Sequence, residues 1–144
     1  MPVIRSLSVW NGRPGGTRSV SSGPKVFSDW ARDGQFVIYT EIIRRRADIW
    51  YLPVESGKPG AQPVKLLGAP ADESQGQLSA DDKWLAYYSD ETGKGEVYIR
   101  PFPMGPGVWK VCVDSAREPR WRSDGRELYF IAAPPNQGRR ASDG

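Results

Sequence analysis

The sequence predicts an all-β protein built from repeated four-stranded units, and three observations lead to this prediction. Glycine and proline, at 16 and 13 of 144 residues, interrupt the apolar runs and leave no room for long helices. The stretch DGQFVIYT recurs after 48 residues as DDKWLAYY and after a further 43 as DGRELYFI. A repeat of this length with four strands is the size of one propeller blade. The fold class is therefore a partial β-propeller, with about two complete four-stranded blades and flanking half blades.

The first two copies of the repeat match without a gap from Trp30 to Pro53. Aromatic residues fall on aromatic residues and aliphatic residues on aliphatic ones, and three positions are identical: Asp33, Tyr39 and Pro53 fall on Asp81, Tyr87 and Pro101. Two unrelated hairpins would have to produce this match by chance. The repeat is the favoured interpretation.

Each copy is expected to contain a first strand, a tight turn, an apolar second strand, a third strand that ends at proline, and a fourth strand of alternating polarity. In copy one these strands are expected near 26–30, 35–40, 48–52 and 63–67. In copy two they are expected near 75–78, 83–89, 96–100 and 108–113. Glycine at Gly34 and Gly125 suits the turns because it adopts positive φ, whereas Asp82 of copy two tolerates that conformation less easily.

The second strands, FVIYT and WLAYYS, are apolar on both faces instead of alternating. Antiparallel strands of this kind need cover on both sides, which a propeller provides because each blade lies between two neighbours. Most of the six tryptophans are expected to lie in the resulting core. Cys112, the only cysteine, is expected to be a small packed side chain on a fourth strand.

The repeat divides the chain into five parts. Blade 1 is expected at 25–68, blade 2 at 69–114 and the first half of a third blade at 115–132. Residues 1–24 contain a possible strand pair that would be the tail of a preceding blade, and residues 133–144 read as a disordered tail. The chain is expected to be a fragment of a longer propeller.

The segments WARDGQFVIYTE, LSADDKWLAYYSDETGKGEVYIRPFP and PRWRSDGRELYFIA resemble the TolB-type β-propeller repeat. The usual Ser-Pro-Asp-Gly turn of that family is replaced in every copy, although the Asp remains. The resemblance covers roughly residues 25 to 132. It is strongest to the propellers behind the kinase domain and membrane helix of bacterial eukaryotic-type serine/threonine kinases, which implies a module for protein interaction or sensing.

Two alternatives stay open on the same resemblance. The chain would serve either as the accessory propeller of a prolyl-oligopeptidase-like serine peptidase or as a TolB-like periplasmic protein that docks envelope partners. Fold does not decide between them, because one fold hosts many functions. A neighbouring kinase domain, a Gly-x-Ser-x-Gly hydrolase or a signal peptide would separate the three.

Several classes of chemistry are disfavoured by composition. The chain has no histidine, no nucleophile elbow and no kinase motif, so no catalytic residue is predicted. The acidic residues of ADES (71–74) with Asp90 and Glu91 match no calcium loop, so neither a metal nor a cofactor is expected. The net charge of +3, from 20 basic and 17 acidic residues, is too small for a basic nucleic-acid face.

The sequence carries no segment of the length needed to span a membrane. No stretch approaches 18 apolar residues, and the first residues, MPVIRSLSVWNGRPGG, lack the continuous apolar core of a secretory signal. We therefore expect no membrane insertion by this chain. The compartment is left open, although the family resemblance implies a periplasmic or extracytoplasmic one.

Function is expected to lie on the loops of one face. The loops 41–47, 68–74, 90–95 and 114–118 should gather there and form a mixed-sign polar rim for a protein or peptide partner. The candidate rim residues are Arg44, Arg45, Arg46, Asp72, Glu73, Asp90, Glu91, Lys94, Arg117 and Glu118. A homodimer that completes a six-bladed propeller is a further expectation, because about three blades are fewer than a closed ring needs.

Overall fold

The computed structural model describes residues 9–10, 17–18, 23–54, 62–112 and 115–132. All regular elements in these ranges are strands. No helix long and apolar enough to cross a membrane is found among them. The tail expected at 133–144 and most of the segment 1–24 lie outside the described residues.

Two antiparallel four-stranded sheets form the centre of the molecule, and we refer to them as blade 1 and blade 2. Blade 1 has the order β3 (Lys25–Trp30), β4 (Phe36–Ile43), β5 (Arg46–Pro53) and β6 (Val64–Leu67). Blade 2 has the order β7 (Glu73–Leu78), β8 (Trp84–Ser89), β9 (Glu96–Pro101) and β10 (Trp109–Lys110). Strand order follows chain order in both blades, as in a propeller.

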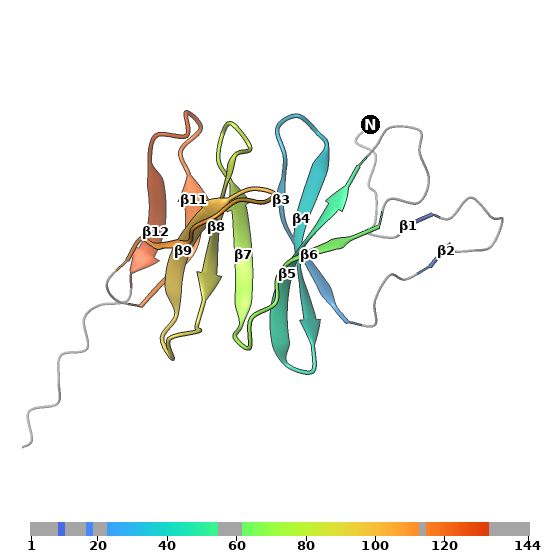
Figure 1. Ribbon diagram of the computed structural model, residues 1–144, viewed down its shortest axis with the longest axis horizontal. Coiled ribbons are helices and arrows are strands. Elements are labelled where there is room, and N and C mark those ends of the chain that lie inside the picture. The colour runs from blue at the N-terminus through green and yellow to red at the C-terminus, as the bar shows by residue number, and fades with distance from the viewer. Residues whose placement is uncertain (1–8, 11–16, 19–22, 55–61, 113–114, 133–144) are drawn as a thin grey trace, which may run out of the picture.

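A two-stranded sheet lies at each end of the row formed by blades 1 and 2. They are β11 (Ala116–Trp121) with β12 (Leu128–Ala132), and β1 (Val9–Trp10) with β2 (Thr17–Arg18). The four sheets follow one another along the long axis of the molecule (Figure 1). The predicted fold class, two complete blades with flanking half blades, is confirmed.

Several strand boundaries differ from the prediction; β7, for example, begins at Glu73 and not near 75. In blade 1 the expected loop 41–47 shrinks to the two residues between β4 and β5, because Ile43 pairs directly with Arg46. In blade 2 the fourth strand is only Trp109–Lys110, shorter than the expected 108–113.

The turns between first and second strands lie along the upper edge of Figure 1 and share one geometry. The residues at their positive-φ position are Gly34 at 76°, Asp82 at 57° and Gly125 at 72°. In each turn the carboxylate of the shared aspartate accepts the backbone N–H two residues later, at 2.8 Å for Asp33, 3.2 Å for Asp81 and 3.0 Å for Asp124. The aspartate that all three copies share therefore closes the turn.

The core lies between the two complete blades. Ile38 and Ile49 of blade 1 pack with Leu85 of blade 2, and all three are fully buried. Gly76 of β7 allows this approach, since a Cβ added there would lie 3.0 Å from the Ile38 Cγ2 atom. The second strands are thus covered on both sides, as their sequence predicts.

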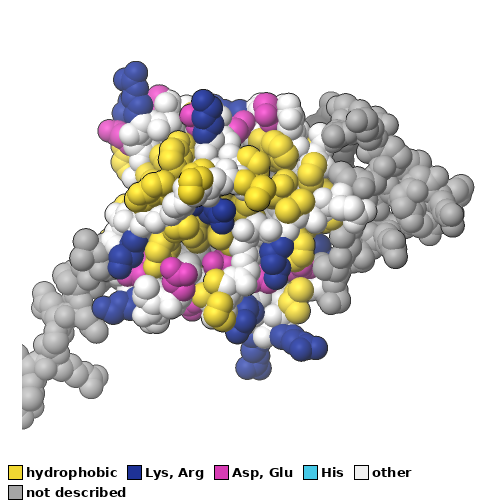
Figure 2. Space-filling view, viewed as in Figure 1, with side chains coloured by type: hydrophobic (Ala, Val, Ile, Leu, Met, Phe, Trp, Pro, Cys, Tyr) yellow, Lys and Arg dark blue, Asp and Glu magenta, His cyan; other side chains and the backbone are white. Residues whose placement is uncertain are grey.

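The expectation that most tryptophans are core residues is wrong. Trp30 and Trp109 are 46% and 48% exposed, and Trp50, Trp84 and Trp121 are half-buried. Trp30 ends the innermost strand of blade 1, and Trp109 lies on the outermost strand of blade 2. On the face seen in Figure 2, hydrophobic side chains form a band between charged side chains above and below.

The innermost strands are tied to one another by polar contacts. The Gln77 amide donates to the Ser28 carbonyl at 2.8 Å, and the Glu118 N–H donates to the Gln75 side chain at 2.7 Å. Gln75 and Glu118 occupy equivalent irregularities of β7 and β11 and have nearly equal positive φ, 58° and 56°. The repeat therefore extends to the backbone distortions that bend each inner strand.

Candidate interaction surface at one rim of the blades

The edge opposite the Asp-containing turns holds the loops predicted to form a rim (Figure 1). The structure ties them together through backbone N–H donors. Ala47 donates to the Asp72 carboxylate at 3.0 Å, and Asp72 donates in turn to the Asp90 carboxylate at 2.8 Å. Ala116 donates to the Gly95 carbonyl at 2.8 Å. The turns of both blades and the start of β11 therefore form one connected edge.

The tip of the β4–β5 hairpin is a strained turn of two arginines. Arg44 and Arg45 have φ of 51° and 66°, the pattern of a type I′ turn that normally selects Asn-Gly. A residue other than glycine in this region costs about 1–3 kcal/mol. Neither guanidinium forms a hydrogen bond or ion pair with another of the described residues, and both side chains are exposed.

The aspartates predicted for the rim have structural roles. Asp72 and Asp90 are half-buried and accept the backbone hydrogen bonds that join the loops. Each of these carboxylates thus has a hydrogen-bond donor within the molecule.

Glu73 departs further from the predicted rim, because its side chain is buried. It is 2% exposed, and its carboxylate accepts the Ala69 N–H at 3.4 Å. Burial raises the pKa of Glu73 to about 7; the Ala69 hydrogen bond acts against this rise, and the charge of Asp48 adds to it. Glu73 is the first residue of β7 and its side chain turns inward, so it is not part of the accessible rim.

The exposed part of the rim is mixed in sign and contains more cations than carboxylates. Five exposed cations face two exposed carboxylates once the three buried or half-buried acids are removed. The cations are Arg44, Arg45, Arg46, Lys94 and Arg117, and the carboxylates are Glu91 and Glu118.

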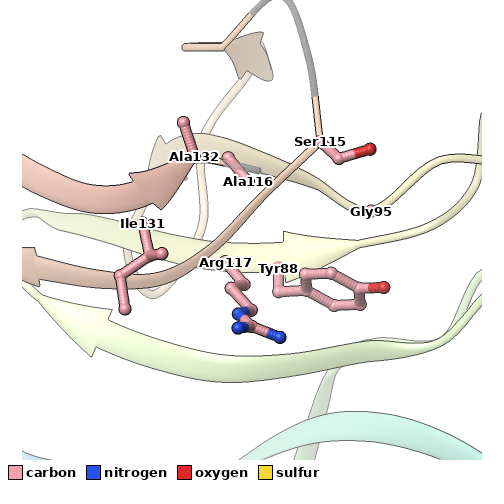
Figure 3. A pocket seen from close by; sticks show the side chains of 7 residues that line it. All are labelled: Tyr88, Gly95, Ser115, Ala116, Arg117, Ile131 and Ala132. Atoms are coloured by element: carbon pink, nitrogen blue, oxygen red, sulfur yellow. The ribbon is translucent and has the colours of Figure 1, made fainter. Parts of the chain in front are cut away.

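A cavity of about 380 Å³ opens at this rim, between blade 2 and the β11–β12 sheet. Figure 3 shows the Arg117 guanidinium and the Tyr88 ring among its lining side chains. The remaining lining residues are Gly95, Ser115, Ala116, Ile131 and Ala132. The Tyr88 ring packs against Gly95, where an added Cβ would fall 2.4 Å from a ring carbon. The sequence repeat carried no signal for this cavity, because its walls come from two different copies.

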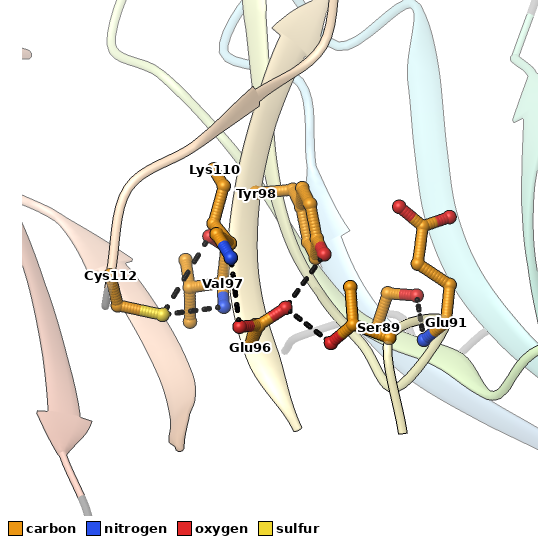
Figure 4. A network of polar contacts seen from close by, with 8 residues as sticks. Ser89, Glu91, Glu96, Val97, Tyr98, Lys110 and Cys112 are labelled. Atoms are coloured by element: carbon orange, nitrogen blue, oxygen red, sulfur yellow. Dashed lines mark hydrogen bonds and ion pairs between the residues drawn. The ribbon is translucent and has the colours of Figure 1, made fainter. Parts of the chain in front are cut away.

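A second polar cluster, beside the β8–β9 loop, has a structural role. The Glu96 carboxylate accepts hydrogen bonds from Thr92 at 2.7 Å and Tyr98 at 2.8 Å, and pairs with Lys110 at 3.1 Å (Figure 4). Burial acts to raise the pKa of Glu96, but these three partners outweigh it and lower the pKa. The cluster joins β9 to the short outer strand β10.

Cys112 packs beside the same strands. It is 7% exposed, and the Val97 N–H donates to its Sγ at 3.2 Å. The prediction of a packed side chain is confirmed. In the part of the chain that the structure describes, no three His, Cys, Asp or Glu residues come together as metal ligands would.

Comparison with known proteins identifies the fold. No protein-family model and no curated protein sequence matches the chain. Among solved structures, putative TolB from Agrobacterium tumefaciens superposes with a TM-score of 0.68 at 19% identity, over 85% of this chain and 43% of that one. The chain has a TolB-like propeller fold.

A second solved structure agrees. TolB from Acinetobacter baumannii superposes with a TM-score of 0.58 at 15% identity, over 84% of this chain and 29% of that one. The chain thus spans less than half the length of either TolB structure. At identities this low, the structural matches establish the fold alone. The activity has to be argued from the site.

Proposed function

We propose that this chain is a non-catalytic propeller module for protein interaction, and that its rim receives an acidic segment of a partner protein. The proposal rests on which charged side chains of the rim are exposed. Three of the five acids are buried or bonded to backbone, so that five cations and only two carboxylates stay exposed.

The hairpin of Arg44 and Arg45 supports the same proposal. Backbone strain that neighbouring packing does not require is common at binding sites. Here a costly pair of residues occupies a turn for which Asn-Gly would be more stable, and their side chains extend to solvent. Arginine also binds carboxylates bidentately, which suits recognition of an acidic segment.

The cavity beside Arg117 gives the rim a place for an anchoring side chain. A carboxylate at its mouth would meet the Arg117 guanidinium, and the Tyr88 ring provides an apolar wall. Interaction sites of this kind combine a polar rim with a small buried anchor.

A binding titration with a labelled glutamate-rich peptide tests the proposal. Replacing Arg44, Arg45 and Arg46 by Ser should weaken binding about tenfold to a hundredfold, since each exposed ion pair contributes roughly 0.5–1 kcal/mol. A matched control replaces Arg32, Lys83 and Arg126, three exposed cations of the opposite edge, by Ser. Equal losses in both variants would show charge attraction without a site and would contradict the proposal.

The parent protein is proposed from the resemblance of the repeats. We infer a bacterial protein in which these blades form the sensing part of a serine/threonine kinase. The TolB-like envelope protein and the accessory propeller of a serine peptidase remain the alternatives, and the TolB-like one is compatible with the structural matches. Sequencing the complete reading frame separates them. A second copy of the chain is a further proposed partner.

A further inference from the structure

The cavity at the rim has one charged wall and several apolar ones. Among the described residues that line it, Arg117 is the only charged one, and none is an acid. Apolar walls come from the Tyr88 ring, Ala116, Ile131 and Ala132 (Figure 3). An occupant that suits these walls has one negative charge and an apolar body.

The Arg117 guanidinium is free to bind such an occupant. The side chain is exposed, and it forms no hydrogen bond or ion pair with another residue that the structure describes. The next two arginines along the chain do have partners. Arg120 donates to the Pro119 carbonyl at 2.8 Å, and Arg122 pairs with Glu127 at 3.0 Å. Arg117 can therefore bind a carboxylate bidentately without giving up an existing contact.

The cavity is too large for a carboxylate alone. Its volume of about 380 Å³ lies within the roughly 300–1,000 Å³ of small-ligand pockets. An internal glutamate that reaches Arg117 has only two methylene groups to set against Tyr88 and Ile131. Among the residues of a peptide, only the last one carries a carboxylate and an apolar side chain on the same Cα atom. The walls therefore fit a carboxyl-terminal residue better than an internal acidic one.

The charges around the Tyr88 ring favour an occupant with a single negative charge. Burial raises the pKa of the Tyr88 hydroxyl, and the charges of Asp90 and Asp72 add to this rise. A second carboxylate placed against the ring would be repelled by the same two aspartates. An apolar side chain is consequently favoured there over an acidic one.

We propose that this cavity binds the carboxyl-terminal residue of the partner protein, with its α-carboxylate on the Arg117 guanidinium and an apolar side chain against Tyr88 and Ile131. The inference rests on the proposed function, because the rim cations would hold the acidic residues that precede the terminus. Lys94 is exposed and directly precedes Gly95 of the cavity wall, so it is placed to meet the nearest of them.

Labelled peptides that differ in one group test the proposal. Two of them share a glutamate-rich sequence that ends in phenylalanine, one as the free α-carboxylate and the other as the amide. The whole chain should bind the free acid roughly tenfold to a hundredfold more tightly, as expected for hydrogen bonds to a charged group. A third peptide, which ends in glutamate as the free acid, should bind more weakly than the first. Equal affinity for acid and amide, or a preference for the terminal glutamate, would overturn the proposal.

The variant Arg117→Gln assigns the effect to the cavity. It removes the charge of an exposed side chain and should bring the ratio of the acid and amide affinities close to one. The matched control is Arg120→Gln, an exposed arginine of the same strand that does not line the cavity, and it should leave the ratio unchanged. If Arg117→Gln fails to fold, Ala132→Trp fills the cavity from an exposed position and should likewise abolish the preference. A ratio that survives these changes, or that falls equally in the control, would contradict the assignment.

The same peptides separate this inference from the proposed function. If the inference alone fails, acid and amide bind equally, and both bind more weakly when Arg44, Arg45 and Arg46 are replaced by Ser. If the proposed function fails, neither peptide binds, or replacing the cations of the opposite edge weakens both by the same amount, and the inference fails with it. N-acetylphenylalanine distinguishes a protein terminus from a free acid. Binding of this compound as tight as that of the peptide would assign the cavity to a small carboxylic acid and overturn the proposal.

Discussion

At the residue scale, backbone conformation and side-chain chemistry conflict at several loop positions. Arg44, Arg45 and Asp82 all hold positive φ, a conformation in which glycine or asparagine costs less. Asp82 has a compensation inside the molecule, because its carboxylate accepts the N–H groups of Arg32 and Asp33. The two arginines have no such compensation among the described residues, which is why we assign them to partner binding.

Replacing the arginine turn by Asn-Gly should separate stability from binding. Arg44→Asn with Arg45→Gly relieves the positive-φ strain and should raise the free energy of unfolding by about 1–2 kcal/mol. The same variant should bind the glutamate-rich peptide more weakly. Urea unfolding and the peptide titration measure the two effects. A loss of stability would mean that the arginine side chains pack usefully in the folded chain.

Glu73 should make stability fall as pH rises. Burial raises its folded-state pKa from the ordinary 4.5 to about 7, so the folded protein binds a proton that the unfolded chain releases. The stabilisation is complete below pH 4.5 and disappears as pH rises through 7, and its size is up to about 3 kcal/mol. Urea unfolding at pH 5 and pH 8 should show this loss in the wild type and a much smaller one in Glu73→Gln. Identical pH dependence in both proteins would contradict the assignment.

At the element scale, two features of blade 2 bring it close to blade 1: the carboxylate of Asp82 and the absence of a side chain at Gly76. Asp82 of blade 2 reaches the turn of blade 1, with its oxygens 3.0 Å and 3.2 Å from the N–H groups of Arg32 and Asp33. Gly76 leaves room for Ile38 and Leu85. The departure from glycine at Asp82, which weakens the turn pattern in the sequence, thus strengthens the contact between blades.

Asp82→Gly should loosen that contact although it removes backbone strain. Two charge-assisted hydrogen bonds disappear, and the net cost is about 1 kcal/mol because glycine recovers part of it. Hydrogen exchange should become faster at the amides of Arg32 and Asp33. Unchanged exchange at both amides would show that the carboxylate does not hold the turn.

Gly76→Ala should force the two blades apart. The new Cβ would lie 3.0 Å from Ile38 Cγ2 and 3.3 Å from Leu85 Cδ1, and overpacking of this kind costs about 1–3 kcal/mol. The cost should fall by more than half in an Ile38→Ala background, where the clashing methyl group is absent. Additive costs measured by urea unfolding would place the strain elsewhere.

At the scale of the whole molecule, blades 1 and 2 share one buried core. One buried cluster contains Ile38 and Ile49 from blade 1 with Leu85, Tyr87 and Tyr98 from blade 2. The β11–β12 sheet contributes one buried residue, Ala116, and the partly buried Leu128 and Phe130 to a smaller cluster. Repeat proteins owe much of their stability to such interfaces between neighbours.

Leu85→Ala should destabilise both complete blades together. Leu85 is fully buried, and truncation of such a side chain costs about 2–5 kcal/mol. Hydrogen exchange followed by mass spectrometry should show β4 and β8 losing protection to the same extent. Loss confined to blade 2 would mean that the blades unfold independently.

The sequence alone determined the repeat, the strand types and the Asp-containing turns. Each of these depends on near neighbours in the chain: Gly34 and Gly125 supply positive φ, Asp33 closes its own turn, and the FVIYT run marks a strand covered on both faces. Local chemistry is repeated in every copy, so the pattern can be read without knowing which blade contacts which.

Only the tertiary structure decided which rim charges are available. Glu73 reads like any exposed loop acid, but packing at the start of β7 buries it, and Asp72 and Asp90 bind backbone groups of other loops. The cavity of Tyr88 and Arg117 likewise joins residues of two copies. Burial and contacts between blades depend on residues far apart in the chain, and a local sequence pattern cannot encode them.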